Sequence, residues 1–198
     1  MIFSARTKYI IVAIIGMFIS CSAYSIERNP KNNFKTTFLS FYTGSAKLTY
    51  ERALFNKQSI EITAGYIGVG YDSFNVQPKG ALFRLAYKFI FSPNQNVLTG
   101  FYLKPEFAYS EFGYNCVDKN LAYAKYSTGN SNTRGRSCMG TLMACAGYQM
   151  AKNILVFDAF VGAGFGIGND AEIQYHHGFI ERYKHLTLTF GVKVGIGF

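Results

Sequence analysis

The chain has 198 residues, of which 16% are charged and 17% are aromatic, with 20 Gly and no Trp. Soluble domains carry about 25% charged residues, so this composition is more typical of strands that meet an apolar phase. The net charge of +9 is not gathered into a Lys/Arg-rich run, which argues against nucleic-acid binding. It favours attraction to anionic lipid headgroups or to lipopolysaccharide phosphate.

Residues 1–25 have the pattern of an export signal. Arg6 and Lys8 precede an apolar run, and small residues follow that run up to Ser25. The run has about 11 residues, whereas a spanning helix needs about 20, so it is too short to be an anchor. We expect cleavage after Ser25, which lowers the net charge from +9 to +7 because Arg6 and Lys8 are lost. Lipid modification of Cys21 is the alternative.

Residues 26–33 are polar and predict a short periplasmic lead-in, and residues 34–198 are predicted to form one domain. In this domain apolar residues alternate with small or polar ones in eight runs, which is the period of a β-strand. The runs are about 9 to 15 residues long, and membrane-spanning strands need about 9–11. The predicted strands are 34–42, 45–54, 59–71, 80–91, 98–110, 138–150, 154–168 and 185–198.

The links between these strands are sorted by length. The even-numbered links, 55–58, 92–97 and 151–153, are all short, and the odd-numbered links 72–79, 111–137 and 169–184 are longer. The first link, 43–44, is the exception because it is also short. Outer-membrane barrels have short periplasmic turns and longer extracellular loops. An even number of strands also returns the chain to the side on which it began, whereas a soluble sandwich has no reason to sort its links.

The two faces of the strands differ in the same way along the chain. The last run, HLTLTFGVKVGIGF, places large apolar residues on one face and small or polar residues on the other. Mid-strand charges fall on the second face, so in a barrel they point into a lumen that side chains just fill. Buried charges are tolerated when they are paired, which predicts an ion-pair network that plugs the lumen. Its predicted members are Glu51, Glu61, Arg84, Lys88, Lys104, Glu106, Asp158 and Lys193.

These patterns predict an all-β fold, an eight-stranded antiparallel up-and-down transmembrane β-barrel. A soluble sandwich would either bury the eight charges or expose Phe and Tyr to water, and both are costly. Tyrosine and phenylalanine near the strand ends are expected to form the interfacial girdles of such a barrel.

Three segments carry a resemblance to a known family: KTTFLSFYTGSAKLTYERALFNKQSIEITAGY (35–66), GFYLKPEFAY (100–109) and GYQMAKNILVFDAFVGAGFGIG (147–168). They cover about a third of the chain and resemble small outer-membrane β-barrels of Bacteroidota that carry a domain of unknown function. The resemblance implies insertion by the barrel assembly machinery, guided by the aromatic Phe198. It implies no activity.

Other candidate sites are weaker. Cys116 and Cys138 flank the 111–137 link and could form a disulfide outside the cell, with two free thiols as the alternative. His176 and His177 lie in the 169–184 link, where a metal would need further ligands, so we expect a surface loop and no metal or cofactor.

The expected function is non-enzymatic, because no Ser lies near a His within a strand to form a nucleophile–base pair. We expect a monomer in the outer membrane of a Gram-negative bacterium, with a structural or surface-interaction role through its long loops. The expected partners are outer-membrane lipids, lipopolysaccharide and the barrel assembly machinery. A lipid-modifying or lipid-A-binding barrel and a narrow pore remain the alternatives.

Overall fold

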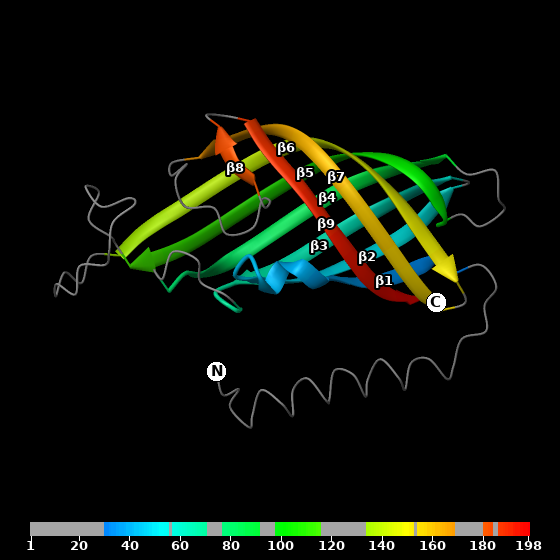
Figure 1. Ribbon diagram of the computed structural model, residues 1–198, viewed down its shortest axis with the longest axis horizontal. Coiled ribbons are helices and arrows are strands. Elements are labelled where there is room, and N and C mark those ends of the chain that lie inside the picture. Colours follow the sequence, from blue (N-terminus) through cyan, green and yellow to red (C-terminus); the bar gives the residue numbers. More distant parts are fainter. Residues whose placement is uncertain are drawn as a thin grey trace, which may run out of the picture.

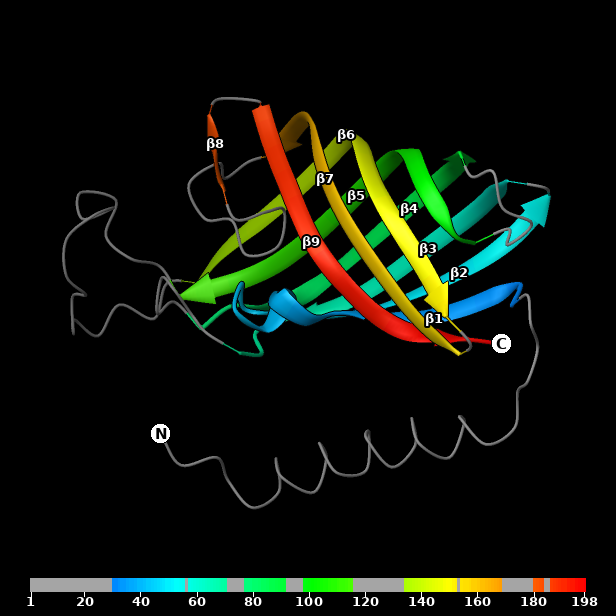
Figure 2. The same cartoon turned by 45° about the vertical axis from the view of Figure 1, so that its right-hand side comes forward.

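The computed structural model describes residues 30–55, 57–70, 77–91, 98–115, 134–152, 154–168, 180–183 and 186–198. The predicted signal peptide, its cleavage site, Cys21 and the first part of the lead-in lie outside these residues. The described strands form one antiparallel sheet that curves round on itself (Figures 1 and 2). The sheet closes because the first strand pairs with the last one, which removes the open edges.

Within the described residues the closed ring contains eight strands, which confirms the predicted eight-stranded antiparallel barrel. Each strand pairs with the next along the chain. The ring consists of β1 (Asn32–Thr37), β2 (Ser45–Phe55), β3 (Gln58–Ile67), β4 (Lys79–Phe91), β5 (Gly100–Asn115), β6 (Arg134–Lys152), β7 (Leu155–Gly168) and β9 (Leu186–Gly197).

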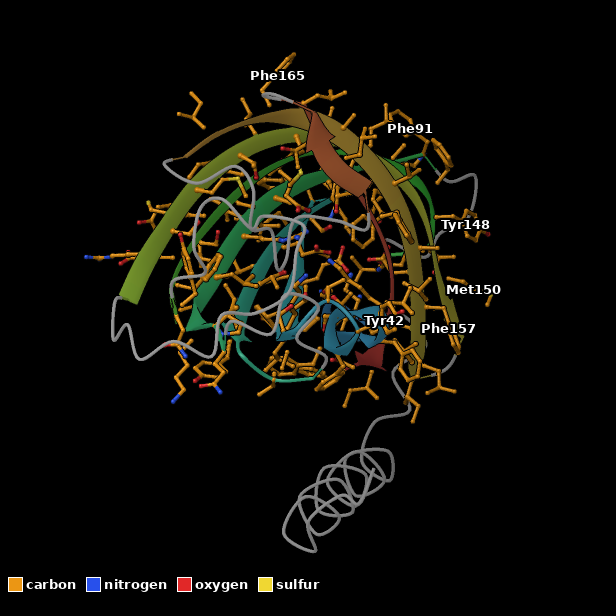
Figure 3. The ribbon with its side chains drawn as sticks, turned by 60° about the vertical axis from the view of Figure 1, so that its left-hand side comes forward. Tyr42, Phe91, Tyr148, Met150, Phe157 and Phe165 are labelled. Carbon is orange, nitrogen blue, oxygen red and sulfur yellow. The ribbon has the colours of Figure 1, made fainter. Side chains whose placement is uncertain are left out.

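Side chains alternate between the two faces of the wall, as the period of two predicts. In β9, Leu186 and Phe190 are exposed while Thr187 and Thr189 are buried. Figure 3 shows Tyr148, Phe157 and Phe165 pointing away from the wall, and all three are exposed. Large apolar side chains therefore cover the outside, and the polar face lines the interior.

The first strand is shorter than predicted. β1 begins at Asn32 and ends at Thr37, and the 3-10 helix η1 (Phe38–Phe41) replaces the rest of the predicted 34–42 strand. The Ser40 hydroxyl donates to the carbonyl of Thr37, and the Thr43 hydroxyl donates to that of Ser40. Such local bonds compete with a strand ladder, and Gly44 completes the turn with a φ of +74°. Among the described residues, no helix has the length and apolar character required to cross a bilayer.

The hairpin of β5 and β6 is longer than predicted. The predicted 111–137 link contributes residues 111–115 to β5 and 134–137 to β6. Glu111 forms an ion pair with Arg136 across the two strands, and Phe112 packs inward against Ile67 and Leu82. Polar residues on the outer face hid this extension, because the apolar alternation ends before the hairpin does.

The last strand has different neighbours along one edge. β1 pairs with β9 only as far as Thr37, which lies opposite Lys193. Further along, the short strand β8 (Ile180–Tyr183), which was predicted as part of the 169–184 link, pairs with β9 through Ile180 and Leu188. Between these two pairings η1 contacts β9. The wall is thus formed by a helical turn at this point of the barrel.

Candidate functional site in the barrel interior

The interior of the barrel holds all eight charged residues that were predicted for the lumen. None of them is more than 6% exposed. The structure adds Lys35 from β1 and Lys47 from β2, which are also buried. Among the described residues the interior therefore contains six bases and four acids. The difference, 6 − 4, is a formal net charge of +2, whereas the predicted set contains four bases and four acids.

A central network occupies the half of the barrel nearer the short turns. We use this name for Lys35, Lys88, Glu51, Glu61 and Asp158. Lys35 Nζ lies 2.7 Å from a carboxylate oxygen of Glu51, 2.7 Å from Asp158 and 3.0 Å from Glu61. Lys88 Nζ lies 2.9 Å from Asp158, 3.0 Å from Glu61 and 3.2 Å from Glu51. Each of the two ammonium groups thus contacts the same three carboxylates.

Neutral side chains complete the hydrogen bonding of the central network. Gln149 Oε1 accepts from Lys35 at 3.0 Å and from Lys88 at 2.8 Å, while its Nε2 donates to Glu51 at 3.0 Å. The Tyr102 hydroxyl donates to Asp158 at 2.5 Å, and its ring lies 4.2 Å below Lys88 Nζ. Buried ions are tolerated only when such bonds satisfy them, and this network meets that condition.

The other half of the lumen, nearer the loops, is connected through Glu106 and Glu61. Glu106 accepts from Arg84 at 2.9 Å and from Lys104 at 2.6 Å. Lys104 also lies 3.1 Å from Glu61 Oε1, and Lys193 forms an ion pair with the same oxygen. Glu61 therefore joins the two halves, because its other oxygen contacts Lys35 and Lys88.

An aromatic ring and a small cavity lie in the loop-side half. Phe160 points inward from β7, with Lys104 Nζ 4.7 Å and Lys193 Nζ 5.1 Å from its ring centre. Beside it is a cavity of about 20 Å³, bounded by η1 and by the inner faces of β2, β3, β4 and β9. Its polar lining comprises Thr37, Ser40, Thr43, Lys47, Thr63, Arg84, Thr189 and Lys193.

Lys35 is the functional residue that sequence reasoning missed. Its strand has only six residues, and its one large apolar side chain, Phe34, gives too little alternation to fix the faces. Lys47 follows the alternation of β2 and also faces the interior, but it is absent from the predicted network. Lys35 also lies close to β9: a Cβ added to Gly195 would clash first with the carbonyl oxygen of Phe34 and then with Cα and Cγ of Lys35, so glycine lets β1 approach closely here.

The remaining predicted site residues have different positions. Phe198 lies beside β1, where its ring stacks on Phe34 with a centroid distance of 5.5 Å and its backbone exchanges hydrogen bonds with Asn32. Cys138 lies in β6 with its sulfur 3.2 Å from the Tyr109 hydroxyl. Its predicted partner Cys116 lies outside the described residues, so the disulfide stays a prediction.

The predicted loop histidines, His176 and His177, also lie outside the part of the chain that the structure describes. Within that part, no group of three or more His, Cys, Asp or Glu side chains is placed to hold a metal ion.

Comparisons with known proteins give a fold likeness and no family. No family model matches the chain, and no curated protein matches it. The structure is similar to the crystal structure of the N-terminal β-barrel domain of Pseudomonas aeruginosa OprF, with 13% sequence identity and a TM-score of 0.48. The match covers 84% of this chain and 95% of that domain. The Bacteroidota family inferred from sequence segments therefore stays a prediction.

Proposed function

We propose that the protein is a non-enzymatic outer-membrane β-barrel with a plugged lumen. The observation that carries the proposal is the inverted distribution of its side chains. Phe, Leu, Val and Tyr side chains are exposed around the outside, while six bases and four acids are buried within the described part of the interior. Water would disfavour this arrangement, whereas acyl chains outside and paired charges inside favour it.

The filled interior supports a structural role over transport. An eight-stranded barrel has an interior that side chains just fill, and here the central network bridges the lumen between β1, β4 and β7. Ions that crossed this network would have to displace lysines that each contact three carboxylates. We infer that the barrel conducts no measurable current.

The proposed interactions of the protein lie at the end opposite the short turns. The predicted long links 111–137 and 169–184 belong to this end, and the β5–β6 hairpin extends toward it as far as Asn115 and Arg134. We propose that these loops face the cell exterior and contact other molecules there. The outer lipid leaflet, with its lipopolysaccharide, surrounds the apolar wall of the monomer.

The test is the behaviour of the purified chain in membranes. Folded protein should partition into the detergent-extracted outer-membrane fraction and migrate faster on gels before heating than after. In planar bilayers it should show no conductance above that of protein-free bilayers. A Lys35→Met, Lys88→Met double variant that folds and does conduct would support the plug directly. A freely soluble protein would refute the membrane assignment, and steady conductance by the unmodified chain would refute the plug.

A further inference from the structure

The loop-side cavity combines positive charge with a break in the strand wall. Lys47, Arg84 and Lys193 reach it from three different strands, β2, β4 and β9. All three bases line this one cavity, and two of them also contact carboxylates, Arg84 with Glu106 and Lys193 with Glu61. None of the three cations is more than 9% exposed. Burying like charges side by side is unfavourable, and an anion between them would offset that cost.

The charge surplus of the interior is concentrated in this half. The central network contains Lys35 and Lys88 against Glu51 and Asp158, with Glu61 shared between the halves. The loop-side half contains four bases, Lys47, Arg84, Lys104 and Lys193, with Glu106 and one oxygen of Glu61. The described residues of this half therefore carry an excess of basic side chains, although Arg84, Lys104 and Lys193 each contact a carboxylate.

Hydroxyl groups surround the same cavity and supply uncharged donors. Thr37, Thr63 and Thr189 lie on the inner faces of three strands, and Ser40 belongs to η1. All four are at most 7% exposed. Lysine, arginine and hydroxyl groups that converge on one point are the usual donors to phosphate-type anions, and the arginine fork suits their oxygens best.

The cavity is small, and it lies where a helical turn replaces a strand. The volume is about 20 Å³, against about 10–15 Å³ for one water, so the cavity excludes any group larger than one compact anion. Leu39 of η1 and the exposed Phe190 of β9 also line it. The exposed rings of Phe38, Phe41 and Tyr42 continue from it on the outside of η1. An apolar outer surface that could hold an acyl chain thus lies next to the residues that line the cavity.

We propose that this cavity binds a single phosphate-type anion, held by Lys47, Arg84 and Lys193 with the surrounding hydroxyls. The anion has two possible sources, a lipid phosphomonoester entering beside η1 or free inorganic phosphate entering from the loop end. The lipid source rests on the proposed membrane location, whereas binding of inorganic phosphate does not.

The experiment uses the full mature chain refolded in a zwitterionic detergent at constant ionic strength. The protein is titrated with sodium phosphate, and sodium chloride is the reference salt. Calorimetry measures binding, and the temperature at which the gel mobility changes measures the unfolding of the barrel. Phosphate should bind in a saturable manner. Lys47→Gln should weaken this binding by about tenfold or more, because a hydrogen bond to a charged group is lost. Lys47→Arg should largely retain it.

Lys79→Gln is the matched control, because Lys79 is an exposed lysine at the same end of the barrel. It should bind as tightly as the unmodified chain. Equal weakening by Lys79→Gln and Lys47→Gln would mean diffuse surface attraction and would overturn the site.

The source is distinguished with nanodiscs of phosphatidylcholine that contain or lack phosphatidic acid. If phosphatidic acid raises the unfolding temperature of the unmodified chain but not of Lys47→Gln, the lipid is a ligand of the site. If only inorganic phosphate raises the unfolding temperature of the unmodified chain and not that of Lys47→Gln, the ligand is a free anion. If neither probe distinguishes the two variants, the proposal is wrong, whether or not the protein proves to be an outer-membrane barrel.

Discussion

The two halves of the barrel solve the problem of buried charge differently. In the half near the short turns, two lysines contact the same three carboxylates, and Gln149 and Tyr102 complete their hydrogen bonding. In the loop-side half the bases outnumber the acids, a cavity remains, and η1 takes the place of a strand. We infer that the half near the short turns stabilises the barrel. The loop-side half contains the cavity for which we propose anion binding.

The sharpest test of this difference is Lys35→Met. This change leaves Glu51, Glu61 and Asp158 with Lys88 as their remaining shared partner in the central network. Breaking a buried ionic network by removing one partner costs about 3–5 kcal/mol. The free energy of unfolding, measured by urea titration in detergent with far-ultraviolet circular dichroism, should fall by that amount. Lys31→Met changes an exposed lysine at the same end and should alter it by at most about 0.5 kcal/mol. Equal effects of the two variants would contradict the role given to the network.

Tyr102→Phe removes one neutral donor from the same network. The Tyr102 hydroxyl bonds to a buried carboxylate, Asp158, so its loss should cost about 1.5–3 kcal/mol. Tyr87→Phe is the matched control, because the Tyr87 hydroxyl bonds to the neutral Gln58 at 2.6 Å and its loss should cost about 0.5–1.5 kcal/mol. The same urea titration measures the loss in the free energy of unfolding for both variants, and the loss should be larger for Tyr102→Phe. A larger loss at Tyr87 would mean that the central network contributes less than the wall.

The seam between β1 and β9 gives a smaller effect on stability and a separate effect on assembly. Phe198→Ala removes the ring that stacks on Phe34, an interaction of about 0.5–1.5 kcal/mol. Quantitative blots of outer-membrane fractions should also show less of this variant, if Phe198 guides assembly as proposed. Phe165→Ala removes an exposed ring from the loop-side half and should leave that level unchanged. Unchanged levels for both variants would count against the assembly role.

Lys47→Gln should have the smallest effect on the free energy of unfolding. Lys35→Met, which changes a buried lysine in the other half, is the variant for comparison. Lys47 shares its cavity with two other bases, Arg84 and Lys193, so replacing it with a neutral side chain should change the free energy of unfolding by less than about 1 kcal/mol. The urea titration in phosphate-free buffer measures it. A loss as large as that of Lys35→Met would erase the distinction between the two halves.

The fold was predictable from the sequence because one rule, the period of two, applies along nearly the whole domain. It assigns Glu61, Lys104 and Asp158 to the interior, where the structure also places them. It failed where the period is interrupted. Residues 38–41 carry enough aromatic character to pass for a strand, yet the Ser40 and Thr43 hydroxyls bond to the local backbone and form a turn.

The candidate site was only partly predictable. The alternation of residues within one strand is enough to predict which side chains face the interior. A cavity also depends on which strands are neighbours and on where one of them ends. The alternation in β2 places Lys47 inside, yet only the termination of β1 at Thr37 brings Thr189 and Lys193 to the same space as η1. The surplus of basic residues in the interior is missed for two other reasons: Lys35 belongs to the strand with the weakest pattern, and Lys47 was left out of the predicted network.

The position of Glu61 means that the two halves cannot respond independently. One oxygen of this carboxylate receives Lys35 and Lys88, and the other receives Lys104 and Lys193. Substitutions in the two halves should therefore give non-additive free energies in a double-mutant cycle, although the side chains compared do not touch. A change in the charge or position of the loop-side cations would then alter the stability of the ion pairs at the opposite end of the lumen, because Glu61 contacts both groups.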